Sequence, residues 1–335
     1  MTNHVRLREI ITDVEELYST GITRGLYCGF ENLHEYYSLK DGGTTYLYGS
    51  PFSGKTEVWF EVMMNLTELY GHRHAIYSPE SGTASEIFAE LISKRLRKPF
   101  YKNYHNHITE DELMKEKDFV DEYFYIIDPK DSDLSVEDFY DEVLMIEKKH
   151  KVKINTTCCD PFNELRHDFA KDNGRQDLYI ENRLGFIRRD AKKYGRHNTI
   201  ITHVADQEPV RMKDGSLCYP PATPRQIAGG QAWYSKEMNM ISVWRPTAGM
   251  NDKETGQPYE ENEVHLIIQK YKPKGVGKRG TAQLYFNIHQ NRYYEKINGT
   301  PRYAGAQLTQ SVPQYSQTKI TPNKELELEK DNFPF

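Results

Sequence analysis

The sequence is poor in cysteine, has no long apolar run and carries no excess of positive charge. Its four cysteines, at positions 28, 158, 159 and 218, lack the spacing of metal ligands and of a disulfide framework. No apolar stretch approaches the roughly 20 residues that a membrane-spanning helix needs, and residues 1–6 lack the apolar region of a secretory signal. We therefore expect a protein of the reducing cytosol that has no membrane partner.

The net charge of −5 over 335 residues creates no global positive field that would attract nucleic acid. Any contact with nucleic acid would have to come from local clusters of lysine and arginine. A chain of this length can form one large domain or two small ones, with a hydrophobic core of ordinary size.

Residues 49–56 match a phosphate-binding loop (P-loop), in which a glycine and four further residues precede Gly-Lys-Thr. The loop consists of Gly49, Ser50, Pro51, Phe52, Ser53, Gly54, Lys55 and Thr56. Its glycines let backbone N–H groups turn toward an anion, Lys55 reaches the β- and γ-phosphates, and the Thr56 hydroxyl ligates Mg²⁺. Residues 45–48 are expected to form the preceding strand and residues 57–70 the following helix, whose positive end faces the phosphates. The sequence therefore predicts a bound nucleoside triphosphate with Mg²⁺.

Strands alternate with helices along most of the chain, which predicts an α/β fold whose first half is a parallel sheet. The expected strands cover residues 45–48, 74–80, 123–127, 153–160, 198–203, 240–244 and 264–270, and residues 283–288 and 292–296 are expected to form a closing hairpin. The late strands have no helices between them, so that edge of the sheet should be antiparallel. Residues 83–97, 135–150 and 179–194 should be helices, and residues 100–118 a loop with helical turns.

The pattern divides the chain into three regions. Residues 1–20 are expected to form an amphipathic linker helix, which either folds back on its own core or docks on a neighbouring subunit. Residues 21–298 form the α/β domain. Residues 299–335 are rich in Gln, Ser, Thr and Pro and are expected to be a disordered tail.

A P-loop site needs a second carboxylate at the end of a core strand, where it holds Mg²⁺ through water. Asp128 follows the more apolar of two candidate strands, and Asp160 follows a strand of Thr and Cys. We choose Asp160, because its strand is followed by residues 161–165, a helix and a strand that ends in a polar residue, as in P-loop ATPases. Asp128 is then an ordinary acid before a turn.

Hydrolysis also needs a group that orients or deprotonates the attacking water. Glu80 ends the strand that follows the P-loop helix, and strand ends cluster around the ligand in such sheets, so Glu80 is the candidate general base. His203 ends a later strand, where it could contact the γ-phosphate and sense its loss. The alternatives are a solvated loop acid for Glu80 and a satisfied core histidine for His203.

In the order of these motifs, residues 21–295 resemble the RecA-like motor domain of hexameric replicative DNA helicases of the DnaB and Twinkle group. The resemblance assigns the catalytic glutamate to Glu80, the metal-associated aspartate to Asp160 and the sensor to His203, and it extends to the segment 175–194 and the glycine motif 227–230. It implies ATP and Mg²⁺ as cofactors, a homo-hexameric ring and 5′-to-3′ movement on single-stranded DNA, in the cytosol of a bacterium or a phage-infected host.

One departure from the family concerns the contact between subunits. The family carries Lys-x-Arg on a late strand that reaches the ATP of the neighbouring subunit, whereas this chain has Lys270, Tyr271 and Lys272. A lysine cannot form the bidentate fork of an arginine. Either Lys270 and Lys272 act on the neighbour less effectively, or Arg279 supplies the guanidinium, or activation by the neighbour is weak. The segment could also be a solvated basic loop.

Two segments are candidates for contact with single-stranded DNA, because phosphate contacts need only local cations. Residues 164–177 contain Arg166, Lys171 and Arg175, and residues 205–226 contain Arg211, Lys213 and Arg225. Both segments could also be surface loops of ordinary charge.

The chain ends in an acidic run that closes with Phe333, Pro334 and Phe335. This ending resembles the C-terminal tip of bacterial single-strand-binding proteins, which docks in basic pockets of replication partners. The tip from Asn332 to Phe335 is therefore expected to bind a replisome partner, and a merely solubilising tail is the alternative.

The motifs predict an enzyme that hydrolyses ATP, and the resemblance to the helicase family implies an ATP-dependent replicative DNA helicase that couples hydrolysis to duplex unwinding. The runner-up is a RecA-like DNA-binding ATPase that does not unwind, such as a replication regulator or a recombinase-type protein. A small-molecule kinase is a more distant alternative, because the sequence shows no acceptor-site motif.

Overall fold

The structure is a computed structural model that describes residues 4–304, apart from residues 23, 130–132, 206, 212–214, 216, 237, 248–249, 253–255 and 273–275. Lys213 and the C-terminal tip Asn332 to Phe335 therefore lie outside the described residues, and the predictions made for them stay predictions.

A ten-stranded sheet forms the centre of the molecule, in the order β12-β11-β10-β9-β8-β1-β5-β4-β2-β3. Its parallel half consists of β1 (Thr44–Gly49), β2 (His74–Tyr77), β3 (Phe124–Ile126), β4 (Thr156–Cys159), β5 (His197–His203) and β8 (Asn239–Trp244). Its antiparallel half consists of β9 (Glu263–Lys270), β10 (Gly280–Asn287), β11 (Arg292–Ile297) and β12 (Thr300–Tyr303). The predicted parallel sheet with an antiparallel edge and a closing hairpin is thus confirmed.

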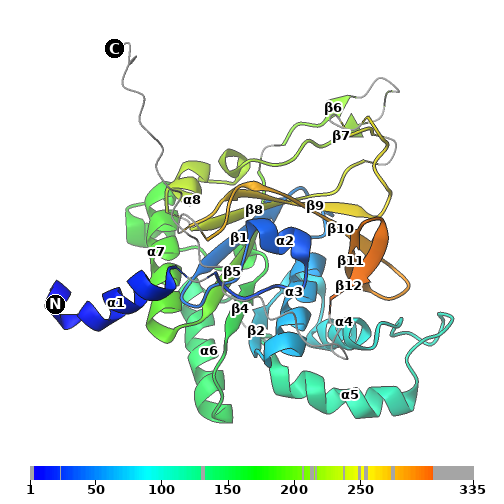
Figure 1. Cartoon of the computed structure of the whole chain (residues 1–335), viewed down its shortest axis with the longest axis horizontal. Helices are drawn as coiled ribbons and strands as arrows, with labels where there is room; N and C mark the ends of the chain where they lie inside the picture. The colour runs from blue at the N-terminus through cyan, green and yellow to red at the C-terminus, as the bar shows by residue number, and fades with distance from the viewer. Residues whose placement is uncertain are drawn as a thin grey trace.

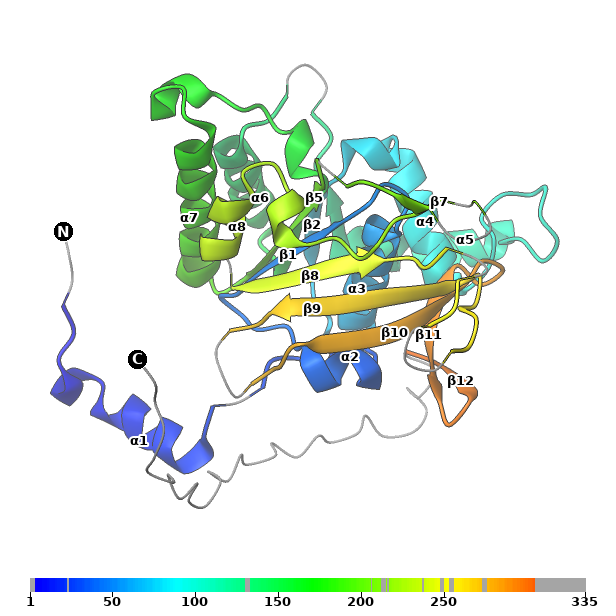
Figure 2. The same ribbon diagram turned by 90° about the horizontal axis from the view of Figure 1, so that it is seen from above.

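Helices cover the two faces of this sheet (Figures 1 and 2). One face carries α2 (Glu31–Tyr36), α3 (Lys55–Tyr70), α4 (Ala84–Leu96) and α5 (Glu110–Tyr123), and the other carries α6 (Val136–His150), α7 (Gln176–Tyr194) and α8 (Gly230–Lys236). Because side chains alternate along a strand, Leu47 packs with the α3 and α4 side, and Tyr46 and Tyr48 pack with the α6 and α7 side.

Short elements complete the fold. They are the 3₁₀ turns η1 (Leu7–Glu9), η2 (Pro79–Ser81), η3 (Phe162–Glu164), η4 (Phe169–Asp172) and η5 (Pro224–Gln226), and a separate two-stranded sheet of β6 (Val210–Arg211) and β7 (Leu217–Cys218). We call the paired strands β6 and β7 the β6–β7 hairpin; both lie within the segment 205–226.

The structure corrects two sequence-based expectations. Residues 100–118 are not simply a loop with turns, because α5 begins at Glu110, where the Thr109 hydroxyl accepts a hydrogen bond from the Glu112 N–H and the Glu112 side chain caps Thr109 in return. The ordered domain also does not end at residue 298, because Thr300–Tyr303 pairs with β11 as a further antiparallel strand. Its Thr-Pro-Arg-Tyr sequence lacks the apolar alternation that marks a strand.

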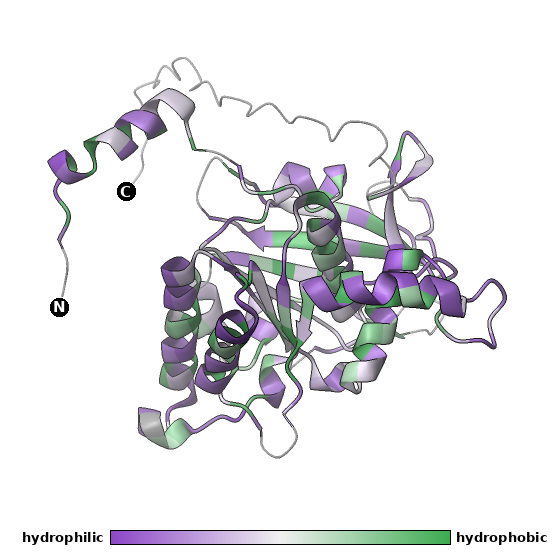
Figure 3. Cartoon of the chain, turned by 90° about the horizontal axis from the view of Figure 1, so that it is seen from below, coloured by the Kyte–Doolittle hydropathy of each residue, from purple (hydrophilic) through white to green (hydrophobic). Residues whose placement is uncertain are grey.

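The N-terminal helix α1 (Ile11–Thr20) does not fold back on the sheet but extends away from it (Figure 2). Every residue of α1 is at least partly exposed, including Leu17 at 55% and Tyr18 at 92%. Both hydrophobic and hydrophilic residues lie along this helix (Figure 3). Of the two sequence-based alternatives, only docking on another subunit remains open. Within the described residues, no helix combines the length and the apolar character that crossing a bilayer requires.

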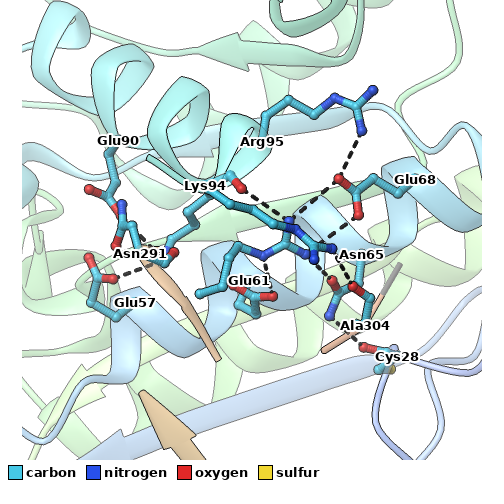
Figure 4. Close-up of polar contacts among 12 residues, drawn as sticks. Cys28, Glu57, Glu61, Asn65, Glu68, Glu90, Lys94, Arg95, Asn291 and Ala304 are labelled. Carbon is cyan, nitrogen blue, oxygen red and sulfur yellow. Dashed lines mark hydrogen bonds and ion pairs between the residues drawn. The ribbon is translucent and has the colours of Figure 1, made fainter. Parts of the chain in front are cut away.

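A buried network of charges fixes α3, the helix that follows the P-loop (Figure 4). We call it the Arg292 network. The Arg292 side chain is fully buried, and its Nε donates to Glu61 of α3 at 2.7 Å. Its terminal nitrogens donate to Asn65 Oδ1 at 2.8 Å and to the Lys94 carbonyl of α4 at 3.0 Å. Lys94, also fully buried, donates to Glu57 at 2.9 Å. The network therefore ties α3 to α4 and β11.

Candidate active site

The candidate residues converge at the carboxyl edge of four neighbouring parallel strands. Gly49 ends β1 and lies beside His203, which ends β5. Asp160 directly follows β4, and Glu80 lies in η2, just after β2. Since these strands are adjacent in the order β1-β5-β4-β2, residues that are far apart in the sequence reach one edge of the sheet.

Both P-loop glycines are required by their surroundings. A Cβ added to Gly49 would lie 2.3 Å from the carbonyl oxygen of Val243 in β8. Gly54 has a φ of 86°, in the left-handed region, and a Cβ there would lie 2.9 Å from the Tyr293 hydroxyl. Phe52, in contrast, is 97% exposed. The loop is thus packed at its two ends and open at its tip, and α3 begins directly behind it.

The ammonium group of Lys55 is buried but only partly bonded. Its Nζ donates to the carbonyl oxygens of Gly49 at 3.3 Å and Ser50 at 3.0 Å. Burial lowers the pKa of Lys55, and the negative charges of Asp160 and Glu80 act against this shift. An ammonium group has three donors, and among the described residues we find no acceptor for the third. The site therefore fits an anion such as a phosphate.

Asp160 and Thr56 lie side by side next to this lysine. The Thr56 hydroxyl donates to Asp160 Oδ2 at 2.5 Å, and the Ser78 hydroxyl donates to the same oxygen at 3.2 Å. Asp160 is 3% exposed. Burial raises its pKa, opposed by the two hydrogen bonds and by the charge of Lys55. A hydroxyl and a carboxylate are the hard oxygen ligands that Mg²⁺ prefers, and Mg²⁺ takes its remaining ligands from water and phosphates, so the pair fits this ion.

Asp128, the alternative carboxylate, lies elsewhere. It follows β3, the outermost strand of the parallel half, and is exposed. Four strand spacings of about 4.8 Å separate β3 from β1, so Asp128 cannot share a ligand with Thr56.

Glu80 and His203 contact each other. His203 Nε2 lies 2.9 Å from Glu80 Oε2, and the nitrogen donates because an ionised carboxylate only accepts. The two side chains are 47% and 30% exposed, so the pair faces the open side of the site. His203 Nδ1 and Ser53 Oγ are buried atoms without a hydrogen-bond partner among the described residues. Buried polar atoms without a hydrogen-bond partner are rare in folded proteins, so these two atoms are available to a ligand.

Several residues of this edge were missed by the sequence analysis. Ser78 bonds Asp160, and Asn163 Oδ1 accepts from the Thr202 hydroxyl at 3.0 Å and from the His203 N–H at 3.3 Å. Gln207 bonds Ser50 of the P-loop. Ser78 could have been found from its place at the end of β2, whereas the other contacts depend on loop conformations that no sequence pattern signals.

The structure does not bring Lys270 and Lys272 to the P-loop of their own chain. Lys270 pairs with Met240 at the start of β8, and the Lys272 N–H donates to Asn239 Oδ1 at 3.2 Å. Asn239 lies beside Thr45, and the two ends of β1 are roughly 16 Å apart at about 3.3 Å per residue. The Lys270 ammonium donates to the Tyr234 carbonyl of α8. Arg279, just before β10, is exposed.

The cations proposed for DNA contact fall into two groups. Arg166 pairs with Asp138 at 3.0 Å and Arg175 with Asp177 at 2.5 Å, all four being largely exposed. Arg211 in β6 and Arg225 in η5 are exposed, and we find no ion pair for either among the described residues. The backbone of Lys171 lies in η4, and its side chain is not described. Of the described cations, Arg211 and Arg225 therefore carry charge that is less compensated than that of Arg166 and Arg175.

The fold and this edge define the class of the protein: it is a P-loop protein with the RecA-like ATPase fold. The chain is similar to the Twinkle homolog protein, chloroplastic/mitochondrial, of Arabidopsis thaliana, with 25% identity over 321 residues that cover 93% of this chain and 41% of the relative. It therefore spans less than half the length of that relative. No protein-family model matches the chain.

Two solved structures are similar in fold. One is an ATPase domain, which superposes with a TM-score of 0.64 at 16% identity, over 87% of this chain and 99% of that domain. The other is a DnaB-like replicative helicase, described with its interactions with primase, which superposes with a TM-score of 0.62 at 16% identity, over 87% of this chain and 67% of the helicase. The fold is thus that of RecA-like helicase motor domains, as the sequence predicted.

Proposed function

We propose that the chain is the motor domain of an ATP-dependent replicative DNA helicase, which moves along single-stranded DNA and unwinds duplex. The observation that carries this proposal is the convergence of Lys55, Asp160, Glu80 and His203 at one sheet edge, where Lys55 and His203 keep hydrogen-bonding capacity for a ligand. The similarity in sequence to a Twinkle homolog favours a helicase over other uses of the same fold.

Each residue then has a distinct role. Lys55 binds the β- and γ-phosphates of ATP, and Thr56 and Asp160 hold Mg²⁺. When bound, Mg²⁺ would neutralise charge on the phosphates. Glu80 accepts a proton from the attacking water. His203, which already contacts Glu80, reports the presence of the γ-phosphate to that base.

The contacts between subunits are the next part of the proposal. Lys270, Lys272 and Arg279 lie away from the P-loop of their own chain, which supports contact with the ATP of a neighbour in a hexameric ring. The exposed apolar residues of α1, among them Leu17 and Tyr18, support docking of this helix on that neighbour. Arg279, exposed and able to form a bidentate fork, is the stronger candidate for the charge that acts across the boundary.

DNA contact is assigned to Arg211, Lys213 and Arg225, with Arg166, Lys171 and Arg175 in a second segment. Movement in the 5′-to-3′ direction follows from the resemblance to the helicase family. The tip Asn332 to Phe335 would dock a replisome partner. We also infer that the protein works in the cytosol of a bacterium or an infected host, as the resemblance to the helicase family implies.

The second candidate is a RecA-like DNA-binding ATPase that does not unwind. The observation that favours it is Lys272 at the position where the family has arginine, because a lysine gives a weaker contact to a neighbour's phosphates.

Two assays separate these functions: ATP hydrolysis with and without single-stranded DNA, and unwinding of a forked duplex. The helicase predicts DNA-stimulated hydrolysis and unwinding, and hydrolysis without unwinding supports the second candidate. Lys55→Ala should abolish nucleotide binding and both activities. Lys115→Ala, which alters an exposed lysine on α5, is the matched control and should retain them. Normal hydrolysis by Lys55→Ala would refute the assignment of the site.

A further inference from the structure

We propose that Gln207 is a positioning residue that couples the P-loop to the β6–β7 hairpin, so that the nucleotide state alters how the hairpin meets single-stranded DNA. The inference rests on the proposed function, because it concerns the response of the same ATP site to DNA. It assigns a role to a residue for which the sequence carries no motif.

The side chain of Gln207 bridges two parts of the chain. Its Oε1 accepts a hydrogen bond from the Ser50 hydroxyl of the P-loop at 2.5 Å, and its Nε2 donates to the carbonyl oxygen of Pro220. A carbonyl only accepts, so the Pro220 contact fixes the amide orientation and leaves Oε1 to face Ser50. The amide therefore has a partner at both its oxygen and its nitrogen.

The bridge lies at the base of the hairpin. Gln207 precedes β6 and Pro220 follows β7, and the two strands pair through Val210 with Cys218 and Arg211 with Leu217. Gln207 therefore joins Ser50 to the base of the hairpin, between its two arms. The exposed Arg211 lies in β6 of this hairpin.

Ser50 is also in contact with the residue that binds phosphate. Its carbonyl oxygen accepts from Lys55 Nζ at 3.0 Å, while its hydroxyl holds Gln207. A phosphate that attracts the Lys55 ammonium competes with this carbonyl, so the position of Ser50 depends on the nucleotide. Among the residues that the structure describes, the bond between Ser50 and Gln207 is the one side-chain hydrogen bond between the P-loop and the segment 205–226.

The other anchors of the segment do not touch the nucleotide site. Trp244 Nε1 donates to the Tyr219 carbonyl at 2.7 Å, and Gln269 Nε2 donates to the Ala222 carbonyl at 2.8 Å. These bonds hold the returning arm on β8 and β9 whatever the P-loop binds. Gln207 is therefore the contact through which the hairpin can respond to the nucleotide.

The test compares the affinity of the full chain for a labelled oligo-dT strand in two states, with Mg²⁺ and a non-hydrolysable ATP analogue or with Mg²⁺ and ADP. Coupling between two sites typically changes affinity by about 5- to 150-fold. We expect the ratio of the two DNA affinities, with the ATP analogue and with ADP, to fall in this range for the wild type. Gln207→Ala should lower the ratio by about two- to tenfold, the value of one hydrogen bond. Gln207→Glu, which cannot donate to Pro220, should lower it as well.

Gln226→Ala is the matched control. Gln226 lies in the same segment, and its side chain accepts from the Thr223 N–H at 2.7 Å. Because this side chain does not bond the P-loop, the affinity ratio of Gln226→Ala should stay at the wild-type value. An unchanged ratio in Gln207→Ala, or an equal loss in both alanine variants, would overturn the role of Gln207 while leaving the proposed function intact. A wild-type chain that shows neither DNA-stimulated hydrolysis nor nucleotide-dependent DNA affinity would refute the proposed function itself.

Discussion

Helix α3 carries two charged clusters that differ in how completely their basic side chains are bonded. At its first turn lies the active-site edge of Lys55, Thr56, Asp160, Glu80 and His203, where Lys55 and His203 retain hydrogen-bonding capacity. Along its body lies the Arg292 network, in which the buried guanidinium donates from all three of its nitrogens. Arg292 is bonded by protein partners on every nitrogen, although Glu61 Oε2 has no partner among the described residues. A basic side chain that is fully held by the protein fixes its helix in place, whereas one with a free donor or acceptor keeps its capacity for a ligand.

The comparison predicts that a change at the active-site edge removes activity and leaves folding intact. Glu80→Gln preserves the shape of the side chain and a partner for His203, but an amide cannot accept the proton of water. We expect kcat to fall by about 10²- to 10⁴-fold, with nucleotide binding retained. Steady-state ATP hydrolysis and binding of a fluorescent ATP analogue measure the two effects. Hydrolysis at the wild-type rate would show that Glu80 is not the base.

The Arg292 network should respond in the opposite way. Arg292→Ala leaves Glu61 buried without its partner, and breaking a buried pair costs about 3–5 kcal/mol of unfolding free energy. Urea denaturation measures this loss. Arg166→Ala, which removes an exposed pair with Asp138, should cost less than about 1 kcal/mol. Equal losses in the two variants would mean that the buried network does not hold the fold more firmly than a surface pair.

A nucleotide should stabilise the folded chain through the active-site edge. With Mg²⁺ and a non-hydrolysable ATP analogue at about 100 times Kd, the folded state gains about 2.7 kcal/mol. Thermal unfolding should show this gain in the wild type and not in Lys55→Ala. A chain whose melting temperature does not change with saturating analogue would contradict the interpretation of Lys55 and His203 as groups with hydrogen-bonding capacity for a nucleotide.

The sequence predicted the parts of the molecule that depend on local patterns. The P-loop, the alternation of strands and helices and the antiparallel edge could be predicted, because each follows from spacing or periodicity. From the sequence we choose Asp160 as the metal-associated carboxylate, although Asp128 follows a more apolar strand. The strand order explains the outcome, because β4 lies close to β1 and brings Asp160 to Thr56, whereas β3 lies at the edge of the parallel half.

Other features follow from contacts between distant segments. Arg292 lies in a hairpin strand and gives no sign in the sequence that it bonds Glu61, 231 positions away. Gln207 and Asn163 lie in irregular segments, where polar residues are ordinary. The helix α5 was missed although Thr109 and Glu112 form a capping box, because the polar and aromatic residues before it favoured a loop.

The smallest predicted effect concerns the cost of keeping Asp160 charged. Burial raises the pKa of Asp160 in the folded chain, so the ionised form is disfavoured relative to the unfolded chain. For a carboxyl group shifted in this direction, the contribution to stability is fully present below the unfolded pKa and is lost as the pH rises through the folded pKa. At neutral pH the ligand-free protein therefore bears this cost.

Asp160→Asn removes the charge and keeps an oxygen that can accept from Thr56 and Ser78. We expect it to stabilise the ligand-free chain at pH 7 by on the order of 1 kcal/mol, while it abolishes Mg²⁺-dependent hydrolysis. The gain should vanish as the pH falls below the unfolded pKa of an aspartate. The control is Asp177→Asn, because Asp177 has a lowered pKa through its hydrogen bond with Arg175 and its loss should not stabilise the chain. If Asp160→Asn destabilises the chain at pH 7, then Asp160 belongs with Glu61 as a structural charge, and the contrast between the two clusters on α3 fails.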